Sequence, residues 1–253
     1  MIEVQGLQKR FSSGRGRTAR HVLAADGVGF VAADACITGL LGPNGAGKTT
    51  TLRIVAGMIP PDAGRVLVDG IDVAREPQRA LGRMGVLSDS RGLYPRLTAQ
   101  ENIVYYGRLQ GMARPAAHQR AQALAQVLDM VPLLDRRTEG FSQGERMKTA
   151  LARALVHDPP NIILDEPTNG LDVLATRALR ETLRRLRDDE GKCIVFSTHI
   201  MQEVQRLCDH VVLVSHGRAV ARGTVAELMA QTGGSDFEDT FVQLAFTDEE
   251  RAP

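Results

Sequence analysis

Short apolar runs alternate with amphipathic stretches in the second half of the chain. The apolar runs have the length of buried strands and occupy residues 161–166 (NIILDE), 193–198 (CIVFST) and 210–215 (HVVLVS). Residues with helical periodicity lie before and between them, at 142–156, 173–187 and about 200–208. Strands that alternate with helices are typical of parallel βαβ units, so this half of the chain predicts an α/β fold.

The first half of the chain has a different pattern. Residues 2–7 (IEVQGL) alternate loosely between apolar and polar, and 36–41 (CITGLL) form a short apolar run that ends at a glycine cluster. RVLVDGIDV at 65–73 contains two short strands around an Asp-Gly turn, which is a strong signal for an antiparallel hairpin. We therefore expect strands and turns over residues 1–41 and a hairpin at 65–73.

The segment between Phe11 and Ala24 (SSGRGRTARHVL) has the Gly, Ser and Arg content of a surface loop. From Lys9 to Arg20 the chain contains five basic residues and no acidic one. Two interpretations are open. The basic residues form the solvated tip of a hairpin, or they contact an anionic partner such as lipid headgroups.

Two further segments are predicted to contain helices. Residues 98–131 have helical periodicity, and Thr98 and Glu101 have the spacing of a capping box. The last twenty residues, 234–253, contain six acidic residues and one basic residue around DTFVQLAF. This pattern predicts a short docking helix followed by a frayed acidic end.

The composition is that of a globular protein in a reducing compartment. Hydrophobic residues make up 43% and charged residues 24% of the 253 positions, which argues against disorder. Three cysteines without metal-binding spacing indicate a reduced, cytosolic environment. The net charge of +1 provides no general field for a polyanion, so we expect no nucleic-acid partner. No apolar run approaches the roughly 18 residues of a membrane-spanning helix, and the N-terminus has no signal-peptide core.

The clearest chemical signal is GPNGAGKTT at 42–50, which matches the phosphate-binding pattern G-x-x-x-x-G-K-[ST]. In such a loop the glycines allow backbone N–H groups to surround phosphate oxygens, and the following helix directs its dipole at the same anion. Lys48 is expected to reach the β and γ phosphates, and the Thr49 hydroxyl to bind Mg²⁺. The residues predicted to contact nucleotide in this loop are Gly42, Pro43, Asn44, Gly45, Ala46, Gly47, Lys48, Thr49 and Thr50.

Acidic side chains and a histidine follow two of the predicted strands. Asp165 and Glu166 end the run at 161–166, and His199 comes directly after the run at 193–198. Ligands bind at the carboxyl ends of strands in open α/β sheets, so we expect these side chains near the phosphates. We assign Asp165 to Mg²⁺, Glu166 to the attacking water as general base, and His199 to the γ-phosphate. The simpler alternatives are a strand end at the surface and a structural histidine.

A second anion site is predicted at FSQGE, residues 141–145. Ser142 and Glu145 have capping-box spacing, so Ser142 is expected to begin a helix whose free N–H groups point outward. A helix N-terminus that carries Ser-x-Gly is suited to an anion. Because the loop at 42–50 already supplies one such site, we infer that the second binds the nucleotide held by another copy.

With these motifs in this order, the chain resembles the ATP-binding subunit of an ABC transporter over about residues 1–230. GPNGAGKT is similar to the Walker A motif of that family, NIILDE to Walker B with its catalytic glutamate, and FSQGE to the LSGGQ signature. The resemblance implies that Phe11 stacks on adenine, for which the alternative is a core position on the first strand. It also matches Asp172, in NGLD, to the D-loop. The signature residues that it implies are Ser142, Gln143, Gly144 and Glu145, and the catalytic ones are Lys48, Glu166 and His199.

The fold that this resemblance implies is a P-loop NTPase. It has a RecA-like, mostly parallel sheet core, an antiparallel β subdomain and an inserted α-helical subdomain. The resemblance places the helical subdomain at about 90–157, within an ATP-binding domain of residues 1–232. Residues 233–253 would then form a short C-terminal helix and the acidic tail.

The chain departs from the family at the Q-loop. Asp89 stands where a glutamine usually approaches Mg²⁺ and the lytic water. Asp89 could bind the metal through water, but an ionised carboxylate adds negative charge near the phosphates and donates no hydrogen bond. For the coupling role of this loop, Leu93, Tyr94 and Leu97 are candidate apolar contacts for a partner helix.

The resemblance implies an ATPase that powers export through separate transmembrane permease subunits, bound at the cytoplasmic face of the cell membrane. Two ATP-binding chains would associate head to tail, as a homodimer or a heterodimer, with ATP and Mg²⁺ between the P-loop of one and the signature of the other. SDSRGLYPRLTAQENI and SDFEDTFVQL are most like ATPases of ABC-2-type exporters, including the sodium-exporter-like branch. The alternative is a soluble ABC-type ATPase or an ATP-dependent regulator that is not coupled to transport.

Overall fold

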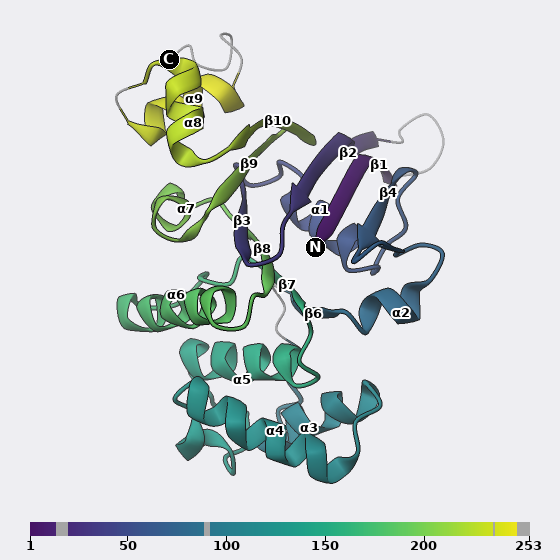
Figure 1. The fold of residues 1–253 in the computed structure, drawn as a ribbon, viewed down its shortest axis with the longest axis vertical. Helices are drawn as coiled ribbons and strands as arrows, with labels where there is room; N and C mark the ends of the chain where they lie inside the picture. Colours follow the sequence, from purple (N-terminus) through teal and green to yellow (C-terminus); the bar gives the residue numbers. More distant parts are fainter. Residues whose placement is uncertain (14–19, 89–91, 235, 247–253) are drawn as a thin grey trace.

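The computed structural model describes residues 1–13, 20–88, 92–234 and 236–246 (Figure 1). Within these residues a six-stranded sheet has the order β10-β9-β3-β8-β7-β6. Its neighbouring strands pair in parallel except for β9 and β10, so the predicted mostly parallel core is confirmed. The strands are β3 (Cys36–Leu41), β6 (Met84–Leu87), β7 (Asn161–Asp165), β8 (Cys193–Thr198), β9 (His210–Ser215) and β10 (Arg218–Gly223).

The central strands β3, β7 and β8 are buried along their whole length, which accounts for their continuous apolar sequences. Successive side chains of β7 pack into different cores, because neighbouring side chains along a strand point to opposite faces of the sheet. Ile162 and Leu164 pack into a cluster that includes the helical part of the chain. Ile163 belongs to a second cluster, together with Leu52 and Ile54 of α1 (Lys48–Val55). The sheet therefore lies between two hydrophobic cores, and β7 contributes side chains to both.

Helices form layers on the sheet and a separate group at one end (Figure 1). In that group α5 lies between the sheet and the pair α3 and α4. α3 begins at the predicted capping box, in which the Glu101 N–H donates to Thr98 Oγ1 over 3.1 Å. The helices after α1 are α2 (Pro77–Leu81), α3 (Ala99–Leu109), α4 (Arg114–Val127), the 3-10 turn η2 (Val131–Leu133), α5 (Gln143–Leu155), α6 (Val173–Asp188), α7 (Met201–Leu207), α8 (Val225–Thr232) and α9 (Phe237–Ala245).

A second, antiparallel sheet of order β2-β1-β4-β5 packs beside the first. The Asp-Gly turn predicted within 65–73 joins β4 to β5, and both Asp69 and Gly70 have positive φ, as a two-residue hairpin turn requires. The strands of this sheet are β1 (Ile2–Ser13), β2 (Arg20–Ala32), β4 (Ala63–Val68) and β5 (Ile71–Asp72). Together the two sheets and the helices give the P-loop NTPase architecture.

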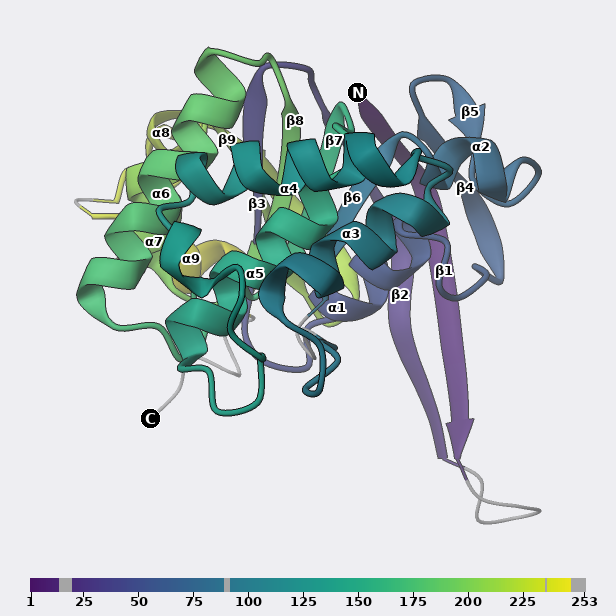
Figure 2. The ribbon, with the colours of Figure 1, turned by 90° about the horizontal axis from the view of Figure 1, so that it is seen from below.

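The prediction of a surface loop between Phe11 and Ala24 is wrong for the residues of this segment that the structure describes. β1 continues to Ser13 and β2 begins at Arg20, and the two strands pair with each other alone beyond the end of β4. They form an arm, residues 9–13 and 20–25, that projects from the body of the molecule (Figure 2). Pairing between the two strands outweighs their loop-like composition. Of the five basic residues counted from Lys9 to Arg20, Arg15 and Arg17 lie outside the described residues.

α9 lies within the segment for which a docking helix is predicted. Phe237 and Phe241 are buried in a third cluster, which contains Val211 and Leu213 of β9. Residues 247–253, which contain three of the predicted tail's acidic residues, lie outside the described residues. Among the described helices, none has both the length and the apolar character to cross a bilayer.

The docking of α9 predicts that Phe237→Ala lowers the free energy of unfolding by about 3 kcal/mol, because it empties a fully buried ring position. Val242→Ala, on an exposed part of the same helix, should cost less than about 1 kcal/mol. Urea unfolding of both variants measures the difference. Equal losses would contradict this packing of α9.

Candidate nucleotide-binding site

The segment 42–47 connects the end of β3 to the start of α1 in a tight loop. Gly47 precedes α1 with a φ of +102°, and a Cβ there would lie 2.2 Å from the carbonyl oxygen of Ala24. A Cβ on Gly42 would lie 2.1 Å from the carbonyl oxygen of Val214. Both positions therefore require glycine, and the loop leaves the first N–H groups of α1 without partners inside the helix.

Lys48 places a buried cation inside this loop. Its side chain is nearly inaccessible, and Nζ donates to the carbonyl oxygens of Gly42 over 2.8 Å and Pro43 over 3.1 Å. The nearest carboxylate oxygen, Oε1 of Glu166, is 3.5 Å away. A buried ammonium whose partners are mostly neutral carbonyls favours the arrival of an anion, and phosphate is the anion that such a loop binds.

Asp165 stands at the end of β7 between two hydroxyl groups. Thr49 Oγ1 donates to Asp165 Oδ1 over 3.0 Å, and Ser197 Oγ donates to the same oxygen over 2.6 Å. Hydroxyl and carboxylate oxygens are the ligands that Mg²⁺ prefers, and Mg²⁺ is usually held by few protein groups together with water and phosphate. Thr49 and Asp165 therefore fit a Mg²⁺ that arrives with a nucleotide.

Glu166 lies directly after β7 with a φ of +47°, a left-handed conformation that is uncommon for a residue with a side chain. The Glu166 N–H donates to Ser197 Oγ over 3.0 Å, which holds the backbone in place. Its two carboxylate oxygens then face Lys48 at 3.5 Å and Nδ1 of His199 at 3.0 Å. The conformation turns Glu166 away from Asp165 and toward the P-loop.

His199 follows β8, and its ring is held by Glu166 on one side and open to solvent on the other. The Ile200 N–H donates to Thr198 Oγ1 over 3.0 Å, which fixes the turn between β8 and α7. The structure thus brings the predicted catalytic residues Lys48, Glu166 and His199 together, and Asp165 is joined to them through Ser197.

Lys48, Glu166 and His199 line one cleft of about 490 Å³, within the usual size range of small-molecule sites. The arm forms one wall of the cleft through Phe11, Val22 and Ala24. Phe11 has an exposed fraction of 43%, so it is not a core residue and its ring is accessible to a ligand. The other lining residues are Asn44, Gly45, Ala46, Gly47, Thr49, Thr50 and Asn169.

Four residues of this site were not predicted from the sequence. Ser197 and Thr198 are hydroxyl residues at the end of an otherwise apolar strand, and that exception is a signal that the sequence offered. Asn169 precedes Asp172 in the D-loop motif and also lines the cleft. Val22 and Ala24 had no usable signal, because their segment has the composition of a loop and reaches the cleft only through pairing with β1.

The signature residues lie outside this cleft. Ser142 caps α5, since its Oγ accepts the Glu145 N–H over 3.2 Å while Glu145 Oε2 accepts the Ser142 N–H over 2.8 Å. These hydrogen bonds, chiefly that from the Ser142 backbone, together with Arg136 lower the pKa of Glu145. Ser142 and Gln143 are exposed and Gly144 is half-buried, and none of them contributes to the lining of the cleft.

Asp172 also lies outside the cleft. Its side chain caps α6 by accepting the Ala175 N–H over 2.8 Å. The next residues, Val173 and Leu174, have exposed fractions of 81% and 78%, so the start of α6 presents an apolar surface. Asp89, predicted as a metal contact, lies outside the described residues.

A family model described as ABC transporter matches residues 26–169, which span the P-loop, Asp165, Glu166 and the signature. The chain belongs to the ABC transporter family. It is therefore an ATP-binding subunit with ATPase activity, and its α/β architecture is that of the family's ATPase cassette.

Individual relatives of this ATPase match over nearly its whole length. It is 39% identical to the ABC transporter ATP-binding protein NatA of Bacillus subtilis (strain 168), over 96% of this chain and 97% of that protein. It is 37% identical to the Nod factor export ATP-binding protein I of Burkholderia lata, over 93% of this chain and 74% of that protein. A solved structure titled "Structure of ATP binding subunit of ABC transporter" superposes with a TM-score of 0.82 at 29% identity, covering 96% of this chain and 98% of that one.

Ser197→Ala should lower kcat by about tenfold, because it removes a hydroxyl that orients both Asp165 and the Glu166 backbone. It should also cost about 1–3 kcal/mol of folding free energy, since it leaves the buried Glu166 N–H without its acceptor. Ser215→Ala is the matched control. The Ser215 hydroxyl is also buried at a strand end but has no hydrogen-bond partner among the described residues. Steady-state ATP hydrolysis and urea unfolding test the pair, and equal effects on kcat would contradict this role of Ser197.

Proposed function

We propose that this ATPase hydrolyses ATP with Glu166 as general base and that it powers export through separate membrane subunits. The observation that carries the proposal is the position of Glu166. Its backbone is turned into the left-handed region, and its carboxylate lies between Lys48, at 3.5 Å, and His199, at 3.0 Å. A carboxylate held at the phosphate end of a P-loop cleft is suited to orient an attacking water.

In the proposed reaction, Glu166 accepts a proton from the water as the water oxygen bonds to the γ-phosphorus. The bond between that phosphorus and the β–γ bridging oxygen breaks, and ADP leaves with that oxygen. Lys48 and His199 stabilise the negative charge that develops on the phosphate oxygens. Thr49 and Asp165 would hold Mg²⁺, which neutralises phosphate charge when it is bound. Phe11 would stack on the adenine ring.

The position of the signature supports a head-to-tail dimer. Ser142, Gln143, Gly144 and Glu145 lie outside the cleft of their own chain, at a helix N-terminus that is open to an anion. In the proposed dimer, the signature of one chain closes the cleft of the other over the nucleotide. The exposed pair Val173 and Leu174 beside Asp172 is suited to the contact between the two chains. A homodimer and a heterodimer both satisfy this geometry.

The names of the relatives support the assignment to export. One relative is named as an export ATP-binding protein, and the matching family model is described as ABC transporter. We therefore propose transmembrane permease partners and a location at the cytoplasmic face of the membrane. The exposed Tyr94 and the half-buried Leu93 and Leu97 are candidates for contact with the permease. We retain the domain division at residue 232 and the metal contact of Asp89 as parts of this proposal.

Glu166→Gln should lower kcat for magnesium-dependent ATP hydrolysis by about a hundredfold or more, because an amide does not accept the proton of the attacking water. ATP binding should persist, since Lys48 and the loop amides are unchanged. The variant should therefore form a dimer on addition of ATP, which size-exclusion chromatography with light scattering detects.

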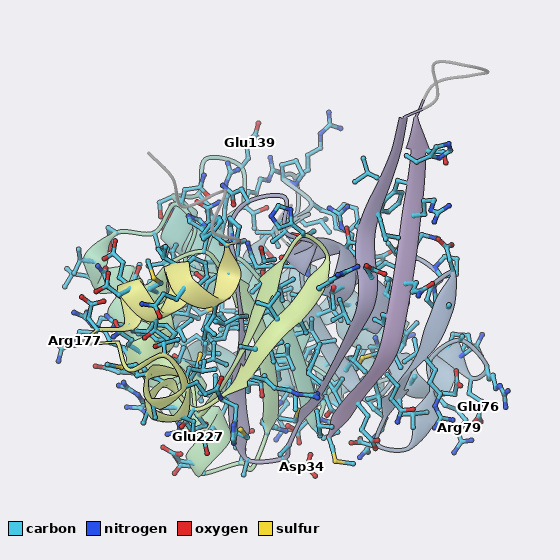
Figure 3. All side chains as sticks on the ribbon, turned by 90° about the horizontal axis from the view of Figure 1, so that it is seen from above. Asp34, Glu76, Arg79, Glu139, Arg177 and Glu227 are labelled. Carbon is cyan, nitrogen blue, oxygen red and sulfur yellow. The ribbon has the colours of Figure 1, made fainter. Side chains whose placement is uncertain are left out.

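Glu139→Gln is the matched control, because Glu139 is an exposed carboxylate that does not line the cleft. Figure 3 shows it at the edge of the molecule. It should hydrolyse ATP at the wild-type rate. If Glu166→Gln also hydrolyses ATP at that rate, Glu166 is not the general base.

A further inference from the structure

Three arginines on one face of α6 hold the neighbouring helix α7. Arg180, Arg184 and Arg187 are spaced by four and three residues, which places them along one side of a helix. α6 and α7 lie side by side in two perpendicular views (Figures 1 and 2). We call these three residues with their partners on and after α7 the arginine clamp.

Two contacts of the clamp are closed hydrogen bonds. Arg184 Nη2 donates to the carbonyl oxygen of Arg206 over 2.6 Å, in the last turn of α7, where a cation is favoured. Arg187 Nη1 donates to Asp209 Oδ1 over 2.9 Å. The other oxygen of Asp209 accepts the Ile37 N–H of β3 over 2.8 Å. This end of the clamp therefore joins α6 to the segment after α7 and to the strand that leads into the P-loop.

The third contact is open. Arg180 Nε lies 3.6 Å from Glu203 Oε2, and both side chains are largely buried. Neither atom has a hydrogen-bond partner among the described residues. A buried carboxylate oxygen and a buried guanidinium N–H without partners are costly, and a shift of less than about 1 Å would join them. The pair is thus the adjustable member of the clamp.

The two helices connect different parts of the proposed catalytic dimer. α6 begins directly after Asp172, with the exposed Val173 and Leu174 that we assign to the contact between chains. α7 begins two residues after His199, which contacts Glu166. A displacement of α6 when the second chain docks would therefore reach α7 through the clamp and, through α7, the position of His199.

We propose that Arg180 and Glu203 are positioning residues for His199, which couple its placement beside Glu166 to the docking of the second chain. This inference rests on the proposed function of His199 in ATP hydrolysis. The pair does not touch the nucleotide cleft, so it acts on the rate through His199 and not through ATP binding.

The test measures kcat and KM for ATP in Arg180→Met and Glu203→Gln. Each variant should lower kcat by about tenfold and change KM by less than about twofold, because ATP binding does not depend on the pair. Arg177→Met is the matched control on the same helix. Arg177 is exposed and lies at the edge of the molecule (Figure 3), and within the described residues its ion pair is with Glu181 on the same helix. It should keep the wild-type kcat.

Loss of folding is separated from loss of positioning by the double variant Arg180→Met/Glu203→Leu. It contains neither buried charge, so it should be at least as stable as the wild type in thermal unfolding. Its kcat should nevertheless stay about tenfold low, because the link between α6 and α7 is absent. A wild-type kcat in this double variant would overturn the proposal and leave the pair with a structural role only.

Combination with His199→Ala tests the route through His199. Arg180→Met should add no further loss to the residual rate of His199→Ala, because both changes remove the same contribution. Losses that multiply would overturn the proposal. If Arg180→Met is as active as wild type while His199→Ala is slow, the proposed positioning role of Arg180 and Glu203 is wrong and the proposed function stands. If His199→Ala itself hydrolyses ATP normally, the proposed role of His199 in hydrolysis is wrong. The positioning role of Arg180 and Glu203, which depends on it, is then wrong as well.

Discussion

The buried ammonium of Lys48 is the constraint around which the site is organised. The tight turn of the P-loop encloses it, and two backbone carbonyls supply its hydrogen bonds while Glu166 lies just beyond hydrogen-bond distance. The two carbonyl oxygens have only partial negative charge, and a phosphate that binds there provides a full negative charge within hydrogen-bond distance of the ammonium. The carboxyl ends of β3, β7 and β8 meet at this point, because parallel strands end at the same edge of a sheet. The nucleotide loop, the acidic residues and His199 are therefore neighbours by topology.

The single chain brings together the side chains that we propose for hydrolysis but leaves its signature on another surface. Ser142 directs the start of α5 outward, and Val173 and Leu174 leave an apolar patch at the start of α6. Both features gain a function when a second chain is present. Catalysis would then depend on docking, and the clamp between α6 and α7 offers a mechanical route from the docking surface to His199. The open Arg180–Glu203 contact is the part of this route that has room to close.

The sequence predicted the parts of the structure that depend on local chemistry. The P-loop has fixed spacing, Ser142 and Glu145 form a local cap, and the central strands are continuous apolar runs. It failed for the arm, where Gly, Ser and Arg content suggested a loop although pairing between strands decides the conformation. The partner of each contact between distant segments had no local signal, although the Ser197 hydroxyl itself had one. Ser197 and Asp165 are 32 residues apart, and Arg180 and Glu203 lie on different helices. Only the folded chain brings these groups together.

The most direct test of a site shared between two chains is ATP hydrolysis by a mixture of Lys48→Ala and Ser142→Arg proteins. Alone, neither variant should hydrolyse ATP, since every cleft would lack either its lysine or a competent signature. In an equimolar mixture half of the dimers pair the two variants, and each of these has one intact site of two, so about a quarter of the wild-type rate should return. A mixture of folded variants that stays as inactive as either protein alone would contradict the shared site.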